Sequence, residues 1–273
     1  MAITTGDGYI GSAKQNIPYT KTAGTTVVAD NRSTIAGAAG SPGALTLLGA
    51  ATPSGGMPTD ATAGYPTINA FGGGATGYLT RVAYACSVAC RLELWDKLYA
   101  VGITTAQLGT LQTLTLSSQP SISSRIPGGT DYVGLRIFVE ITTTMSATAT
   151  TINVTYTNEN GTTGRTVAAT SGSLSGFVAG RWVELGLQAG DRGVQKIESV
   201  VIGGATNAAG ALNVIIARRL WQNRVITANF SGSDSLDRTG MPVVWADSAI
   251  VACVIADSTS SGIVDLEFEI ANG

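Results

Sequence analysis

Apolar and polar residues alternate in long runs from residue 82 to the end of this sequence. In the last run Val264, Leu266, Phe268 and Ile270 share one face, and acidic residues occupy the other. A period of two is typical of a half-buried β-strand. The same pattern predicts strands over residues 82–94, 133–141, 152–156, 183–187 and 212–216. The chain is therefore expected to consist mainly of strands.

Clusters of turn-forming residues separate these runs, for example at 158–161 and 189–193. Helical periodicity is weak, and the best candidates are short segments at 94–99 and 105–108. Alternating strands joined by short turns favour antiparallel pairing. We therefore expect an all-β protein in which residues 76–273 form a jelly-roll-like antiparallel β-sandwich, with an immunoglobulin-like topology as the alternative.

Residues 1–75 have a different composition, rich in Gly, Ala, Ser, Thr and Pro. Few large side chains are present there to offset the entropy of ordering the backbone. A solvated linker would carry more charge than this segment does. We expect an extended, mostly irregular N-terminal arm that lies on a capsid, on a neighbouring subunit or on its own domain. The few charged residues of this arm are Asp7, Lys14, Lys21, Asp30, Arg32 and Asp60.

The cysteines Cys86, Cys90 and Cys253 are an odd number in a long chain, which argues against a secreted disulfide framework. Within one strand over 82–94, Cys86 and Cys90 would lie ~13 Å apart, too far for a disulfide. We expect three free, buried thiols. The chain has no histidine, which removes the usual general base and the commonest metal ligand. We expect no enzyme activity.

Charge and hydropathy narrow the classes of partner. Charged residues make up only 12% of the chain, hydrophobic residues make up 44%, and the formal net charge is -2. This balance supplies no basic surface for phosphates, so no direct binding of nucleic acid is expected. No run approaches the ~18 apolar residues that a membrane helix needs. The N-terminus lacks the pattern of a signal peptide, so we expect assembly in a cytoplasm.

Three segments carry residue types that other proteins use for chemistry. Residues 6–11 match G-x-G-x-x-G but lack the preceding strand of a nucleotide-binding fold. Residues 231–237 hold two carboxylates but depart from the calcium-loop spacing. Asp265, Glu267 and Glu269 share one strand face, where an edge guarded against aggregation, or a stripe that faces a partner, is a simpler explanation than a glycosidase pair. We expect no cofactor and no metal.

The densest positive charge surrounds Trp221, which lies close to Arg218, Arg219 and Arg224. A rigid aromatic residue among guanidinium groups is typical of an interface, although core packing explains Trp221 equally well. These four residues are our candidate interface. The tryptophans as a set also suit a sugar-binding surface, the others being Trp95, Trp182 and Trp245.

Several short segments resemble a group of tailed-bacteriophage structural proteins, the head-associated decoration or cement proteins. The similarity extends over residues 78–230, and more loosely over the rest. The segments that carry it are residues 91–98, 114–120, 123–127, 187–195 and 197–200.

The resemblance implies a virion protein on the capsid surface that stabilises the shell. It implies the major capsid protein as partner, a homo-oligomer with a trimer favoured, and no catalytic residues. The alternative function is a head–tail connector, a collar, or a tail component that binds a carbohydrate receptor.

Overall fold

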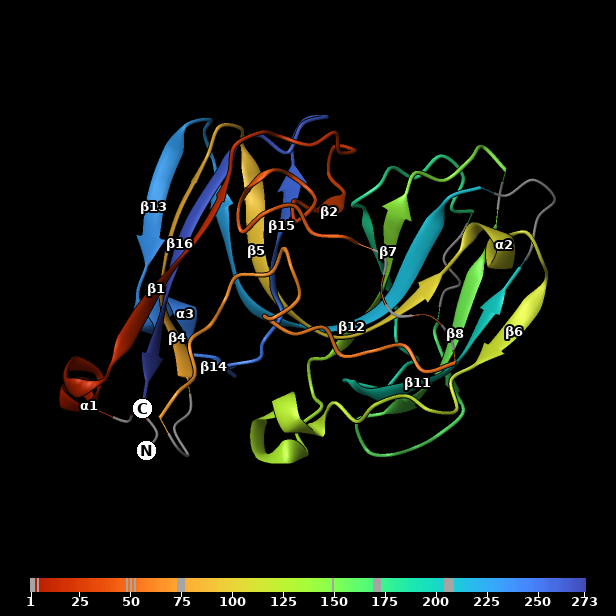
Figure 1. The fold of residues 1–273 in the computed structure, drawn as a ribbon, viewed down its shortest axis with the longest axis horizontal. Helices are drawn as coiled ribbons and strands as arrows, with labels where there is room; N and C mark the ends of the chain where they lie inside the picture. The colour runs from red at the N-terminus through yellow and green to blue at the C-terminus, as the bar shows by residue number, and fades with distance from the viewer. Residues whose placement is uncertain are drawn as a thin grey trace. The chain divides into compact units, whose positions relative to one another are not determined.

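The computed structural model describes residues 3, 5–47, 49, 51, 53–72, 77–148, 150–168, 173–203 and 209–273. These residues form an all-β structure with antiparallel sheets, which confirms the predicted fold class (Figure 1). The chain divides into two compact units. Unit 1 comprises Met1–Thr46, Thr59–Asp96 and Leu220–Gly273, and unit 2 comprises Leu47–Pro58 and Lys97–Arg219. Two strands, β5 (Cys90–Ile103) and β12 (Ala211–Val225), each begin in one unit and end in the other.

The helices are short and the strands are numerous. The α-helices are α1 (Gly6–Gly11), α2 (Thr105–Leu108) and α3 (Leu236–Thr239), and 3-10 helices cover Ser123–Arg125 and Pro127–Gly129. The strands are β1 (Lys14–Lys21), β2 (Arg32–Thr34), β3 (Gly40–Ser41), β4 (Gly77–Cys86), β5 (Cys90–Ile103), β6 (Gln112–Thr115), β7 (Arg136–Thr143), β8 (Ile152–Asn158), β9 (Arg165–Thr166), β10 (Trp182–Leu185), β11 (Val194–Ile202), β12 (Ala211–Val225), β13 (Phe230–Asp234), β14 (Val243–Val244), β15 (Ile250–Ala256) and β16 (Val264–Asn272).

Unit 1 is a sandwich of two sheets. One sheet has the strand order β13-β4-β16-β1-β3, with β14 also pairing with β4. The facing layer contains β2, β15 and the first half of β5. Alternate residues of both layers form one apolar core, which includes Val82, Leu92, Val254 and Phe268. Full burial of each such side chain contributes ~1.5–3 kcal/mol, so the alternation fixes which face of each strand turns inward.

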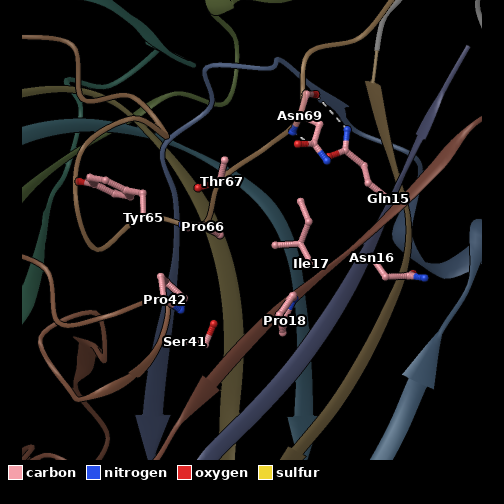
Figure 2. Close-up of a pocket in the computed structure, with 10 residues that line it drawn as sticks. All are labelled: Gln15, Asn16, Ile17, Pro18, Ser41, Pro42, Tyr65, Pro66, Thr67 and Asn69. Carbon is pink, nitrogen blue, oxygen red and sulfur yellow. Dashed lines mark hydrogen bonds between the residues drawn. The ribbon is translucent and has the colours of Figure 1, made fainter.

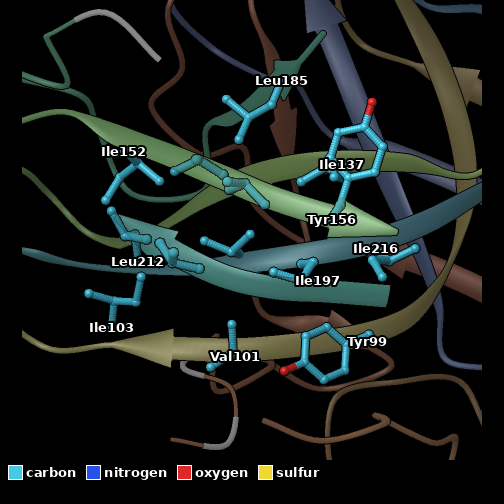
Figure 3. Close-up of a cluster of buried hydrophobic side chains, with 14 of the residues drawn as sticks. Tyr99, Val101, Ile103, Ile137, Ile152, Tyr156, Leu185, Ile197, Leu212 and Ile216 are labelled. Carbon is cyan, nitrogen blue, oxygen red and sulfur yellow. The ribbon is translucent and has the colours of Figure 1, made fainter. Parts of the chain in front are cut away.

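Unit 2 is built in the same way. Its four-stranded sheet has the order β6-β11-β8-β9. Side chains of β8 and β11 meet side chains of β5, β7, β10 and β12 in a second apolar core (Figure 3). Tyr156, Ile197 and Ile216 are fully buried there. Two-layer antiparallel packing is what the sequence predicts, whereas the jelly-roll connectivity stays a prediction.

Most predicted strands are confirmed, but residues 82–94 do not form one strand. β4 ends at Cys86, the chain turns through residues 87–89, and β5 begins at Cys90. Cys86 and Cys90 therefore lie in facing layers of unit 1 and belong to the same apolar core. The predicted separation of ~13 Å for a single strand is wrong for this reason. All three cysteines are free and buried, as expected.

The segment predicted as an arm contributes to both units. β1 pairs with β16 from Lys14 opposite Ala271 to Thr20 opposite Asp265. Residues 47–58 belong to unit 2, where Gly49 N donates to Asn213 Oδ1 at 2.7 Å. The expected boundary between residues 75 and 76 lies outside the described residues. Between its strands much of the segment is irregular, and its backbone bonds both within the segment and to strands of the sandwiches.

Candidate interaction surfaces

The predicted interface residues are spread along β12. Trp221 is only 4% exposed, and its Nε1 donates to Asp234 Oδ2 at 2.8 Å. Its ring packs against Tyr84 with 5.3 Å between centroids, so it belongs to the core of unit 1. Arg219 and Arg224 are exposed, and Arg218 is half-buried. The position of Trp221 agrees with the alternative of core packing. Its ring does not lie at the surface beside the arginines.

The other tryptophans are also largely enclosed. Trp95 and Trp182 are each 2% exposed. Trp95 Nε1 donates to Glu93, and Trp182 Nε1 donates to Glu140. Trp245 is half-buried. A sugar platform needs an exposed aromatic face, which Trp95, Trp182 and Trp221 do not present.

The three acidic residues of β16 have partners. Thr20 Oγ1 donates to Asp265 at 2.7 Å, and Arg81 pairs with Glu267 at 2.5 Å. Glu269 is buried and accepts from Tyr9 and Thr80 hydroxyls. β16 lies between β4 and β1, so the expectation of a guarded sheet edge is wrong. These carboxylates fasten neighbouring strands together.

The remaining motifs are accounted for by local structure. Residues 6–11 form α1, and the Thr5 hydroxyl accepts from Gly8 N at its start. Residues 231–234 belong to β13, where Asp234 binds the side chains of Trp221 and Asn223. Within the described part of the chain, no three His, Cys, Asp or Glu side chains are placed to hold a metal ion. No described helix is long and apolar enough to span a membrane.

A hollow of about 290 Å³ lies beside β1 in unit 1 (Figure 2). Gln15 Nε2 donates to Asn69 O at 3.1 Å, and Asn69 N donates back to Gln15 Oε1 at 2.9 Å. Ile17, Pro18 and Tyr65 supply apolar surface. No charged side chain lines this hollow, and its amides are paired across the rim.

One end of unit 1 carries an unusual set of exposed apolar side chains. Ile226 is 77% exposed, Phe230 and Ile263 are each 50% exposed, and Val28 is 36% exposed. All four lie in or beside loops at the end of unit 1 away from both chain termini (Figure 1). We call Val28, Ile226, Phe230 and Ile263 the apolar tip. Exposed apolar groups gathered in this way mark interaction surfaces.

Backbone hydrogen bonds join the loops of the apolar tip to one another. Asn229 N donates to Cys86 O at 2.9 Å, and Ser87 N donates to Ile263 O at 3.0 Å. Val27 N donates to Thr259 O at 3.0 Å. Asn229 has a φ of 61°, a left-handed conformation in which asparagine is enriched, and it turns the chain into Phe230. Because these loops are already ordered, binding at the tip would cost little conformational entropy.

One residue of the apolar tip, Ile263, is marked in the sequence by its position relative to a strand. Ile263 stands in phase with Asp265 and Glu267, the outward-facing residues of β16. An apolar residue on the polar phase of a strand is expected at a partner-binding position. Phe230 and Ile226 lie among polar loop residues and give no periodic signal.

Unit 2 contains a polar cluster around Asp191. Arg165 binds both carboxylate oxygens, with Nε 2.9 Å from Oδ2 and Nη2 3.0 Å from Oδ1. Tyr156 and Asn158 also donate to this carboxylate, at 2.6 and 2.8 Å. Burial raises the pKa of Asp191, but the hydrogen bonds from Arg165, Tyr156 and Asn158 outweigh it and bring the pKa to about 2. The cluster holds β8, β9 and the loop before β11 together.

Asp191 should make the protein sensitive to acid. Its folded-state pKa is below the ordinary value of 3.8, so its stabilisation is complete above pH 3.8 and is lost as pH falls toward 2. We expect Asp191→Asn to remove a stabilisation on the order of 1–2 kcal/mol at neutral pH. Thermal unfolding from pH 7 to pH 2 measures this, with the exposed Asp131→Asn as control. Parallel pH profiles for wild type and Asp191→Asn would contradict it.

The sequence matches no protein-family model and no curated protein. Among solved structures, it aligns with the VP2 subviral particle of infectious bursal disease virus at 11% identity and a TM-score of 0.22, covering 96% of this chain and 80% of that chain. Structures of the Gt and Gx strains of this virus align at 9% identity and a TM-score of 0.19. They cover 96% of this chain and 81% and 79% of theirs. Similarity at this level assigns no function.

Proposed function

We propose that this chain is a non-enzymatic virion structural protein that binds a bacteriophage capsid as a decoration protein. The observation that carries the proposal is the apolar tip, a set of exposed aliphatic and aromatic side chains on hydrogen-bonded loops. A capsid surface assembled from many copies of the major capsid protein would cover one tip per decoration subunit. Several weak contacts within a homotrimer would then add through multivalency.

Two other features support a structural role. The carboxylates of β16 that resembled a catalytic pair are engaged with Thr20, Arg81 and Tyr9, which leaves them stabilising strands. The sequence segments that resemble decoration proteins lie mostly in β5, β6 and β11 and the segments beside them. These are the framework of both units, so the resemblance concerns architecture.

The test is reconstitution on purified phage heads that lack this chain. We expect saturable binding with many copies per head, counted against the major capsid protein on a gel. Electron cryomicroscopy of the decorated heads locates the density. Density confined to the portal vertex or tail would replace this proposal by the connector or tail alternative.

Variants of the apolar tip test its part in binding. We expect the double substitution Phe230→Ser, Ile263→Ser to weaken head binding at least about tenfold, since buried aromatic and aliphatic anchors commonly contribute more than ~1 kcal/mol each. Ile10→Ser is the matched control, because Ile10 is 74% exposed in α1 of the same unit but lies outside the tip. Equal binding of both variants and the wild type would contradict the assignment of the tip.

A further inference from the structure

Cys86 and Cys90 are the residues that the turn at 87–89 brings together. Cys86 ends β4 in one sheet of unit 1, and Cys90 begins β5 in the facing layer. Both side chains point into the apolar core between the layers, where Cys86 is 2% exposed and Cys90 is fully buried. Cys86 Sγ donates to Ser261 O at 3.5 Å, and the two thiols are close enough to shift each other's pKa. The three-residue turn keeps the ends of β4 and β5 close to each other, and a disulfide requires Cα atoms within ~7 Å.

The surroundings favour a reaction at Cys86. The hydrogen bond from Cys90 lowers the pKa of the Cys86 thiol, burial opposes this, and the backbone N–H groups of Val88 and Ser87 lower it further. The hydrogen bond to Cys86 raises the pKa of Cys90, and burial adds to this. The thiolate is the reactive form of cysteine, so Cys86 is the nucleophile of the pair and Cys90 the group that responds to it.

Short turn and loop segments cover the pair. Residues 87–89 are half-buried turn residues at the surface of unit 1. On the other side lies Gly262, where an added Cβ would come within 3.1 Å of Cys86 Sγ. A brief opening of this short turn exposes the sulfur without unfolding a sheet. Cys253 does not lie beside this turn. It is in the middle of β15, between Ala252 and Val254, whose side chains point into the core, so its own side chain points to the opposite face of the strand.

We propose that Cys86 and Cys90 are an oxidation site that closes into an intramolecular disulfide when the folded protein meets a peroxide. The Cys86 thiolate attacks one peroxide oxygen, the O–O bond breaks, and hydroxide leaves as water after taking a proton. Cys86 then carries a sulfenic acid. The Cys90 sulfur attacks the Cys86 sulfur, the S–O bond breaks, and a second water leaves. The peroxide is reduced to water, and the two thiols are oxidised to one disulfide.

The bond would join the two layers of unit 1 directly beneath the apolar tip. Ser87 N donates to Ile263 O, and Asn229 N donates to Cys86 O. The turn between the two cysteines and the end of β4 are therefore bonded to loops of the apolar tip. A cross-link at this point restricts the unfolded chain and slows opening of the turn. We expect slower amide hydrogen exchange over residues 84–92 and a higher unfolding temperature in the oxidised form.

Digestion with trypsin separates the cysteine pair from Cys253, so mass spectrometry can follow the reaction. Trypsin cleaves after Arg81 and Arg91, so both cysteines fall in the single peptide 82–91, whereas Cys253 falls in residues 239–273. The folded full-length chain is treated with hydrogen peroxide, denatured with iodoacetamide, digested and analysed by mass spectrometry. We expect peptide 82–91 to lose two hydrogens and resist alkylation until it is reduced. The peptide containing Cys253 should be alkylated throughout.

Single substitutions separate the two roles. In Cys90→Ser the sulfenic acid at Cys86 has no partner, so we expect labelling by dimedone, while Cys86→Ser should leave Cys90 as an alkylatable thiol. Cys253→Ser should behave as wild type. Alkylation of both cysteines in wild type, after a dose that oxidises its methionines, would overturn the proposal whether or not the variants fold. The assay needs only the purified chain, so its outcome is independent of capsid binding.

Discussion

Glu140→Gln should destabilise unit 2 by about 3–5 kcal/mol, the usual cost of removing one partner of a buried ion pair. Glu140 is fully buried on β7, and Lys97 of β5 is 2% exposed. Lys97 Nζ lies 2.8 and 2.9 Å from the two carboxylate oxygens. Loss of the negative charge would leave a buried ammonium group without a counter-charge, far from compensation by water.

The carboxylate of Glu140 also serves two further donors. Trp182 Nε1 donates to Oε1 at 3.0 Å, and Asn213 Nδ2 donates to Oε2 at 2.6 Å. Asn213 in turn binds the backbone of Leu47 and Gly49, which connects these two residues to the network. The effect should therefore exceed that of an isolated pair, and it should loosen the segment 47–58 that belongs to unit 2.

Urea unfolding followed by circular dichroism measures the effect. The control is Glu184→Gln, because Glu184 of β10 lies 3.6 Å from Arg136 and both side chains are more than one-third exposed, at 41% and 38%. Such surface pairs contribute ~0–1 kcal/mol. The double substitution Lys97→Met, Glu140→Gln should recover part of the loss, because it removes the unpaired charge. A loss in Glu140→Gln no larger than in Glu184→Gln would contradict this account.

The alternating strands could be predicted because one face of each is apolar. β16 shows this most clearly, with Val264, Leu266 and Phe268 buried and the residues between them polar. β15 could not be found in this way, since all of Ile250–Ala256 is apolar and a strand covered on both faces has no alternation. The break at residues 87–89 was also hidden, because the apolar period continues from β4 into β5 without a change of phase.

The candidate interface was predicted less well than the fold. Charge density led to Trp221, yet its indole N–H is satisfied by Asp234, a residue thirteen positions away that no local pattern connects to it. The apolar tip depends on which loops the fold gathers at one end of unit 1. Sequence spacing does not give that, since Val28 and Ile263 come from opposite ends of the chain.

Lys21 presents the same difficulty, because its partners are backbone carbonyl groups that leave no mark in the sequence. It appeared to be one of few charges in an extended arm, but it is 1% exposed in unit 1. Its Nζ donates to Pro42 O at 2.8 Å, Ala38 O at 3.1 Å and Ala36 O at 3.5 Å. One ammonium group thus anchors the chain from residue 36 to residue 42 against β1.

Lys21→Met should therefore destabilise unit 1 by about 2–3 kcal/mol, because buried carbonyl groups would lose their donor. Lys14→Met is the matched control, since Lys14 lies on the same strand and is exposed. Burial lowers the pKa of Lys21 from 10.5 to about 8. Between these two values the unfolded chain binds the extra proton, so wild-type stability should rise with pH relative to Lys21→Met.

Thermal unfolding of both variants and the wild type at pH 7, 8, 9 and 10 tests both parts of this prediction. The stability gap between wild type and Lys21→Met should widen above pH 8, while the gap for Lys14→Met stays constant. A gap that stays constant up to pH 10 would mean that the three carbonyl groups keep the folded-state pKa of Lys21 from falling below its ordinary value. No gap at any pH would mean that the backbone pairing of β1 with β3 and the apolar contacts of Tyr19 and Ile35 hold residues 36–42 without help from Lys21.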